Sequence, residues 1–207
     1  MKKLVAIALA LVATTASAAS VINSKHDMSK YTGVGGAVGS GDACYFCHAA
    51  HNNTTFAPLW ARFNPTNGAY TTYTSGTVSV NISGSLDNFS LVCMSCHDGS
   101  VALNVTMKGK QGTNAANVYI LANNAKIGPD LSNDHPVSVN WVGGGIAGLT
   151  ASVPAPFRVY NTSRGATALS AALTCGSCHA VHDPGISKFL RANPTSGSFC
   201  ITCHASK

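Results

Sequence analysis

All eight cysteines of the chain occur in pairs of the same spacing, and a histidine directly follows each pair. The four motifs are Cys44-Tyr45-Phe46-Cys47-His48, Cys93-Met94-Ser95-Cys96-His97, Cys175-Gly176-Ser177-Cys178-His179 and Cys200-Ile201-Thr202-Cys203-His204. In a Cys-x-x-Cys-His motif, two thiols can each add to a vinyl group of one porphyrin, and the adjacent histidine then lies under the iron as its proximal ligand. The motifs therefore predict four covalently attached haems of the c type.

Two other uses of paired cysteines are weaker explanations. Two four-cysteine zinc sites would not require a histidine directly after every second cysteine. Four disulfides, which an exported chain of this kind would permit, do not require it either. The repeated histidine favours haem attachment over both.

Four further histidines stand outside the motifs, and four haem irons need four distal ligands. These histidines are His26, His51, His135 and His182. Methionine is an alternative distal ligand, but Met1 lies at the extreme N-terminus and Met94 inside a motif, so Met28 and Met107 are the competitors. Because the supply of histidines equals the demand, we expect two histidines at every iron.

The spacing of two of these histidines limits which iron they can bind. His51 and His182 each follow a proximal histidine by three residues. That reach is too short to pass around a porphyrin edge to its opposite face, so each should bind the iron of a different haem. Proline follows His135 and restricts it to an extended conformation, and we assign His135 to the haem of Cys93 and Cys96.

His26 precedes the first motif on a separate arm. The glycine-rich residues 32–41 follow it and are expected to be flexible. The arm can fold back onto its own subunit or reach a haem of a neighbouring one. In the second case the ligand bond is itself a head-to-tail contact between subunits, and a contact of that kind that does not close produces a filament.

The first 18 residues have the features of a secretory signal peptide. Lys2 and Lys3 are followed by an apolar stretch and by the small-residue sequence Ala16-Ser17-Ala18. A membrane anchor is the weaker alternative, because an apolar run of about ten residues is shorter than the ~20 that span a bilayer. We expect an exported protein without a transmembrane span, either extracellular, held at the outer-membrane surface, or periplasmic.

The elements that carry the motifs are expected to be short. Glutamate is absent, 20 residues are glycine and only 10% are charged, which disfavours long surface helices. We expect residues 19–207 to form a single tetrahaem cytochrome domain, mostly coil with short helices and a few short strands around four haems. Residues 78–82 and 137–141 alternate apolar and polar side chains and are predicted as isolated strands.

An internal repeat predicts a duplicated two-haem unit. After the first motif the chain continues to Arg62-Phe63-Asn64-Pro65-Thr66, and after the third motif to Arg191-Ala192-Asn193-Pro194-Thr195. Both stretches follow a Cys-x-x-Cys-His-x-x-His sequence, and each leads to a second motif without the extra histidine. The units are approximately residues 42–100 and 173–207, joined by the haem-poor residues 101–172.

The charge gives little support to nucleic-acid binding. The net charge of +6 falls to +4 without Lys2 and Lys3, and eight haem propionates would bring it to about −4. Basic residues are also not clustered with aromatic ones.

The motifs and their flanks resemble the multihaem c-type cytochromes of metal-reducing bacteria. Similar segments are Cys-Met-Ser-Cys-His-Asp-Gly-Ser at 93–100, Asp-His-Pro-Val at 134–137 and the Cys-x-x-Cys-His-x-x-His pattern. The length, the four motifs and the histidine arm are most similar to the outer-membrane cytochromes of the E kind, whose subunits polymerise into extracellular filaments with a continuous haem chain. The resemblance implies identical subunits as partners, a neighbour's haem as a possible site for His26, redox partner cytochromes, and external acceptors such as metal oxides.

Three functions remain open at this point. Four irons with two histidines each have no open position, which favours electron transfer without catalysis. Such a protein can be a filament subunit or a soluble periplasmic shuttle. A multihaem reductase of a small nitrogen compound is the alternative from another class, and it would need one five-coordinate haem.

Overall fold

The structure is a computed structural model that describes residues 20–33, 36–37, 42–51, 59–65, 69–77, 82, 85–123, 125–141, 148–162 and 169–205. The predicted signal peptide, residues 1–18, and most of the strand expected at 78–82 lie outside the described residues. Within the described ranges, no helix has the length and apolar character needed to cross a membrane.

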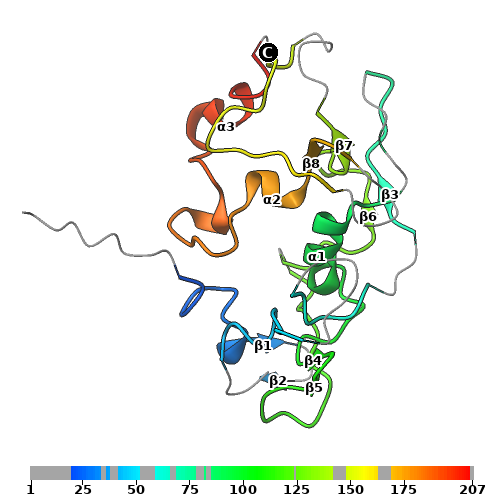
Figure 1. The fold of residues 1–207 in the computed structure, drawn as a ribbon, viewed down its shortest axis with the longest axis vertical. Helices are drawn as coiled ribbons and strands as arrows, with labels where there is room; N and C mark the ends of the chain where they lie inside the picture. The colour runs from blue at the N-terminus through cyan, green and yellow to red at the C-terminus, as the bar shows by residue number, and fades with distance from the viewer. Residues whose placement is uncertain are drawn as a thin grey trace, which may run out of the picture.

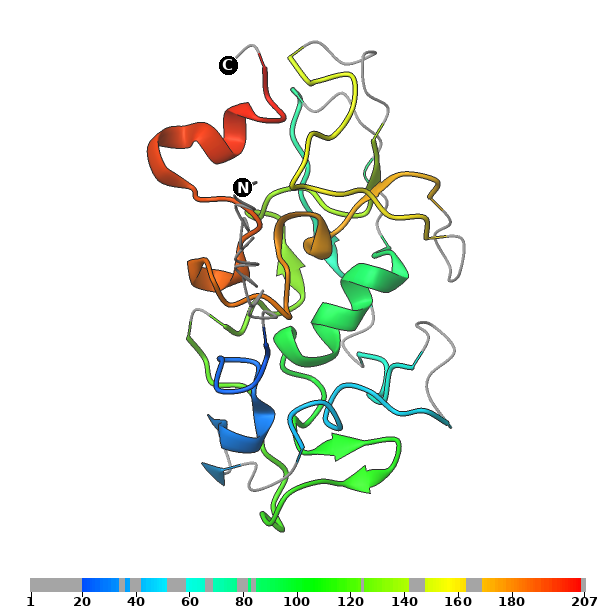
Figure 2. The same ribbon diagram turned by 60° about the vertical axis from the view of Figure 1, so that its left-hand side comes forward.

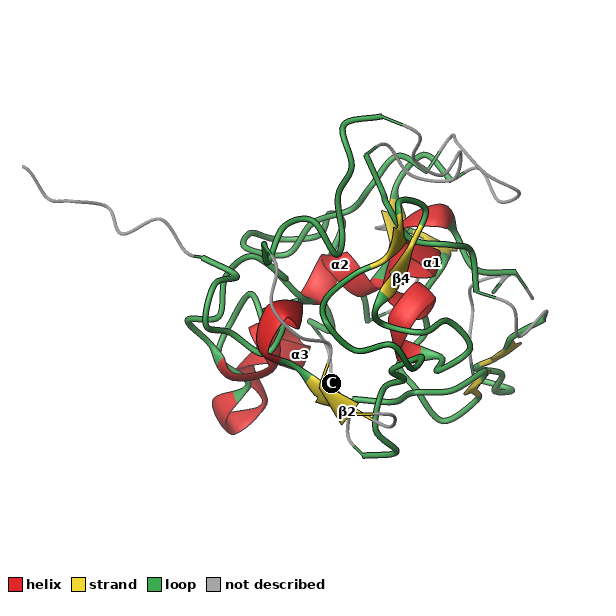
Figure 3. Ribbon diagram, turned by 90° about the horizontal axis from the view of Figure 1, so that it is seen from below, coloured by secondary structure: helices red, strands yellow, loops and turns green. Residues whose placement is uncertain are grey.

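The described chain is mostly coil with short helices and a few short strands, so this part of the predicted fold is confirmed (Figure 3). The helices are η1 (Met28–Lys30), α1 (Asn88–His97), α2 (Cys175–Cys178), η2 (Ser187–Phe189), η3 (Thr195–Gly197) and α3 (Ser198–Ile201). Only α1 exceeds one turn of an α-helix by a wide margin. Regular secondary structure therefore provides little of the framework.

The strands are two residues long and form four separate pairs. They are β1 (Thr32–Gly33), β2 (Gly36–Ala37), β3 (Thr71–Thr72), β4 (Val105–Thr106), β5 (Gly109–Lys110), β6 (Asp130–Leu131), β7 (Val139–Asn140) and β8 (Ala172–Leu173). The pairs β1–β2, β4–β5 and β7–β8 are antiparallel, and β3–β6 is parallel. The pairs β1–β2 and β4–β5 join neighbouring segments, whereas β7–β8 and β3–β6 join segments that are far apart in the sequence.

Two expectations for local structure can be compared with these strands. The segment 137–141 contains β7 at Val139–Asn140, which pairs with β8, so a short paired strand lies where an isolated one was expected. The glycine-rich segment after His26 contains the antiparallel pair β1–β2. Residues 34–35 and 38–41 of that segment lie outside the described residues.

Helix α1 has defined signals at both ends. Asp87 caps its N-terminus by accepting hydrogen bonds from the backbone N–H groups of Phe89 and Ser90. Beyond the last residue, Gly99 adopts φ +79°, a left-handed conformation that glycine tolerates and that often ends helices. These signals fix the helix that carries the second motif.

Among the described residues, buried apolar side chains form two small clusters. The first contains Phe46, Leu103, Val118 and Ile120, with Cys47 and Cys96 packed against it. The second contains Tyr70, Leu86, Met94 and Leu131. Residues of the first and second motifs belong to these clusters, so attachment motifs are part of the packing itself.

The three α-helices follow one another along the long axis of the molecule (Figures 1 and 2). The pairs β1–β2 and β4–β5 lie at one end, α1 and α2 lie near the middle, and α3 lies towards the other end. Since α1, α2 and α3 carry the second, third and fourth motifs, the motifs are distributed along the length of the protein.

Candidate haem-binding sites

Each motif is folded as a turn of helix or a helix-like turn. The backbone N–H groups of His48, His179 and His204 donate to the carbonyl of the first cysteine of their own motif, at 2.9, 3.1 and 3.0 Å. The second motif lies within α1. Residues three and four apart share one face of a helical turn, so two thiols and the histidine of each motif lie on one side.

The first and second motifs are adjacent. Cys47 and Cys96 pack against the same apolar cluster. Burial raises the pKa of the Cys47 thiol to about 12, and the nearby Cys96 raises it further in the same direction. The indole Nε1 of Trp60, a residue that pairs with His48 in a β-bridge, also donates to the Ser95 hydroxyl at 3.2 Å.

The second and third motifs meet where α1 packs on α2. The thiols of Cys93 and Cys175 are hydrogen-bonded to each other, and this bond is the main reason that the pKa of Cys93 is raised. The third and fourth motifs are also neighbours, since burial and then Cys203 raise the pKa of Cys178 to about 11. Each motif therefore lies near the one that follows it in the sequence.

The histidine rings lie in three pairs, each joining a proximal histidine of a motif to a histidine outside the motifs. The pairs and their ring-centroid distances are His26 and His97 at 6.0 Å, His48 and His182 at 6.1 Å, and His135 and His204 at 6.2 Å. Two imidazoles on opposite sides of one metal, with bonds of about 2 Å, have ring centres ~6 Å apart. The three pairs thus fit the spacing of two axial ligands.

The pairs differ in part from the expected assignments. His135 faces His204 of the fourth motif, and not the second motif to which we had assigned it. The reason is that His26, in the segment before the first motif, already lies against His97. His182 faces His48, a histidine of another motif, which agrees with the limit set by its three-residue reach.

His26 is held within its own chain. Its ring stacks on Phe189 with a centroid distance of 4.4 Å and meets His97 edge to face. Burial, followed by the neighbouring His97, lowers the pKa of His26 to about 4. The Nδ1 atom of His26 is buried and has no hydrogen-bond partner among the described residues.

The environment of several histidines keeps one ring nitrogen available. Nδ1 of His97 is hydrogen-bonded to the carbonyl of Ala125, and Nδ1 of His179 to that of Lys188 at 2.8 Å. A ring that donates from Nδ1 presents the lone pair of Nε2 to a metal. Burial also lowers the pKa of His48 and of His97, which favours the neutral imidazole that metal ligation requires.

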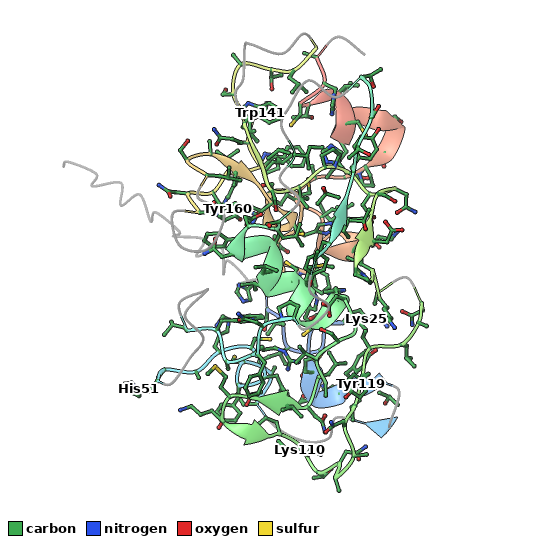
Figure 4. The ribbon with its side chains drawn as sticks, turned by 90° about the vertical axis from the view of Figure 1, so that its right-hand side faces the viewer. Lys25, His51, Lys110, Tyr119, Trp141 and Tyr160 are labelled. Atoms are coloured by element: carbon green, nitrogen blue, oxygen red, sulfur yellow. The ribbon has the colours of Figure 1, made fainter. Side chains whose placement is uncertain are left out.

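His51 and His179 remain outside these pairs. All eight histidines lie in the part of the chain that the structure describes, and within it neither ring contacts another histidine ring. His51 is exposed and lies at the edge of the molecule (Figure 4). The single chain therefore does not bring together His51, the remaining candidate distal ligand, and His179, the remaining candidate proximal ligand.

The predicted repeat has the same backbone pairing in both copies. Ala49 donates to the carbonyl of Leu59, and Ala180 donates to that of Phe189. The two acceptor residues both have left-handed backbones, with φ of 59° and 57°. A β-bridge from the proximal histidine accompanies each hydrogen bond, to Trp60 in the first copy and to Leu190 in the second.

Large apolar side chains next to the motifs are exposed in the bare polypeptide. Tyr45 lies in the first motif and Ile201 in the fourth, with 43% and 54% of their surface accessible. Leu59 and Val181 lie beside His48 and between His179 and His182, at 52% and 41%. A large flat porphyrin would cover such surfaces, so this chain's residues fit haem at the motifs in chemistry as well as in spacing.

Sequence reasoning missed residues that support the sites. Arg62 is fully buried and donates to the carbonyls of Ala102 and Leu103 at 2.8 and 2.7 Å. Arg191 donates to the carbonyl of Gly176 inside the third motif, and to the Tyr160 hydroxyl. Both arginines start the repeated Arg-x-Asn-Pro-Thr sequence, which signalled their importance but not their partners. Of the competing methionines, Met28 packs on the first apolar cluster, as Cys47 and Cys96 do, and Met107 is exposed.

Comparison with protein-family models found no match for this chain, and comparison with curated proteins found no significantly similar sequence.

Proposed function

We propose that this protein is an exported tetrahaem c-type cytochrome that transfers electrons without catalysing a reaction of its own. The observation that carries the proposal is the spacing of 6.0–6.2 Å in three histidine pairs, each of which joins a motif to a histidine elsewhere in the chain. Haem iron held by two histidines exchanges single electrons and has no position for a substrate.

The order of the motifs supports a conduit. The cysteines of the first and second motifs pack on one apolar cluster, those of the second and third interact directly, and Cys203 of the fourth lies close enough to Cys178 of the third to act on it electrostatically. The helices α1, α2 and α3, which carry the second, third and fourth motifs, follow one another along the long axis (Figure 1), and this arrangement supports the proposal of four attachment sites in a row. Such a row gives electrons a short path from one end of the protein to the other.

We further propose that copies of the chain join into an extracellular filament that carries respiratory electrons to external acceptors. His26 is paired with His97 inside the chain, which supports the folded-back position of the arm rather than its contact with a neighbour. The exposed His51 takes over the role of the ligand between copies, and the position it fills is opposite His179. The periplasmic shuttle is the alternative in which no such contact forms.

Electron microscopy of the haem-loaded, purified protein tests the filament. We expect unbranched polymers. A uniformly dispersed monomer in which all four haems are six-coordinate would contradict the filament and leave the shuttle.

The unpaired His179 also gives the reductase alternative a specific location. If His51 supplies no ligand, the haem of Cys175 and Cys178 would be five-coordinate and open to a small molecule. Carbon monoxide binding to the reduced protein distinguishes the two functions. The conduit predicts no rapid binding by polymers, and rapid binding of one carbon monoxide per chain in polymers would favour the reductase.

A further inference from the structure

We propose that the buried carboxylate of Asp87 lowers the reduction potentials of the two haems whose attachment sites meet where α1 packs on α2. The inference rests on the proposed attachment of haem at the second and third motifs. It concerns a residue outside all motifs, which neither the motif pattern nor the histidine pairs require.

Asp87 is fully buried and receives four hydrogen bonds. Its Oδ1 accepts from the backbone N–H groups of Phe89 and Ser90 at 2.8 and 3.0 Å. Its Oδ2 accepts from the hydroxyls of Ser90 and Ser138, both at 2.7 Å. All four partners donate, so both oxygens of the carboxylate serve as acceptors.

This carboxylate lies beside the junction of the two motifs. The Ser90 hydroxyl that donates to Asp87 is also hydrogen-bonded to Cys175. Cys175 is in turn hydrogen-bonded to Cys93, and that bond is the first cause of the raised pKa of Cys93, with burial next and the charge of Asp87 acting in the same direction. One buried charge therefore acts on the attachment cysteines of two neighbouring sites.

A buried negative charge favours the more positive state of a nearby redox centre. Ferric haem carries one more positive charge than ferrous haem, and the interaction is weakly screened away from water. The N-terminus of α1 and the hydroxyls reduce this field without cancelling a full charge. The positive charge of Arg191 acts on Cys178 of the third motif and there partly offsets the negative charge of Asp87. We therefore expect Asp87 to lower the potential of the haem at the second motif more strongly.

The test is a spectroscopic redox titration of the haem-loaded protein and its Asp87→Asn variant. Asparagine is nearly isosteric and also caps helices, so the variant removes the charge and keeps the cap. We expect the ratio of reduced to oxidised haem, at a fixed potential, to rise about tenfold for two of the four haems, which corresponds to about 59 mV. Unchanged titration curves of a folded variant with four haems would overturn the inference.

Two further variants separate charge from structural damage. Ser138→Ala keeps the charge and removes one hydroxyl that partly neutralises it, so we expect a smaller shift in the opposite direction. Potential shifts of the same sign in both variants would indicate loosened packing and overturn the inference. If the Asp87→Asn protein does not accumulate, the potential shift of Ser138→Ala alone decides. Asp130→Asn, which removes an exposed carboxylate, is the matched control and should leave the curve unchanged.

The haem content of the unmodified protein separates this inference from the proposed function. A chain that carries no covalent haem contradicts the proposed function. Four haems whose potentials do not respond to these variants contradict only the role of Asp87.

Discussion

The imidazoles of His48 and His182 face each other with ring centroids 6.1 Å apart, although the two residues belong to opposite copies of the repeat. Under the proposed function, each copy would supply one ligand of a shared haem site. Such a pairing would fix the two copies relative to each other, because metal ligation across them would add to the two small apolar clusters of the described part.

Replacing His182 by alanine should therefore remove the sixth ligand of the haem at Cys44 and Cys47. We expect one of the four haems to become high-spin and the reduced protein to bind about one carbon monoxide per chain. Electron paramagnetic resonance and carbon monoxide titration measure this. Lys108→Ala, in the exposed turn between β4 and β5, is the control and should keep the parental spectrum.

The assignment of His135 can be tested in a protein without the fourth haem. In a Cys200→Ala, Cys203→Ala background, a further His135→Ala change should leave the spectrum of the other haems unaltered, because His135 faces His204. A new high-spin signal in that background would instead assign His135 as the distal ligand of the haem at Cys93 and Cys96.

Both the site and the fold could be predicted from the sequence in part. The composition predicted the dominance of coil, and the motifs, which are local patterns, allowed the attachment cysteines and proximal histidines to be proposed directly. The partner of each distal histidine could not, because contacts such as His26 with His97 join segments far apart in the chain. Proline after His135 restricted its backbone but contained no information about which motif it approaches.

The supporting residues escaped prediction for a similar reason. Asp87 and Ser138 are hydrogen-bonded although they are 51 residues apart in the sequence, and hydrophobic periodicity does not predict contacts of that kind. Arg62 was visible as part of the repeat, but its carbonyl acceptors lie on another segment. The strands were also hard to predict, since elements of two residues carry too little alternation to distinguish them from coil.

Tyr70→Phe should destabilise the protein without affecting the haems. The buried Tyr70 hydroxyl donates to Oδ2 of Asp98 at 2.8 Å, and Asp98 keeps its bonds from Ser100 when that donor is lost. We expect the free energy of unfolding to fall by about 1 kcal/mol. Urea unfolding measures the change. Equal stabilities of the Tyr70 variant and the parent would contradict a contribution from this hydrogen bond.

Polymer formation should depend on His51 and not on His26. His51→Ala should give dispersed chains with four haems, one of them five-coordinate, because the ligand between copies is lost. His26→Ala should alter the haem at Cys93 and Cys96 and leave polymers in place, since His26 faces His97 of its own chain. Electron microscopy and visible spectra of both variants measure this. Loss of polymers only in the His26 variant would assign the contact between copies to the arm.

The most direct test of the central claim is the haem content and spin state of the purified, matured protein. Intact-mass measurement should give four covalent haems per chain, and electron paramagnetic resonance of polymers should give only low-spin ferric signals from two-histidine ligation. Fewer than four haems, cysteines bound to zinc or joined as disulfides, or a persistent high-spin haem in the polymers would contradict a conduit of four six-coordinate haems.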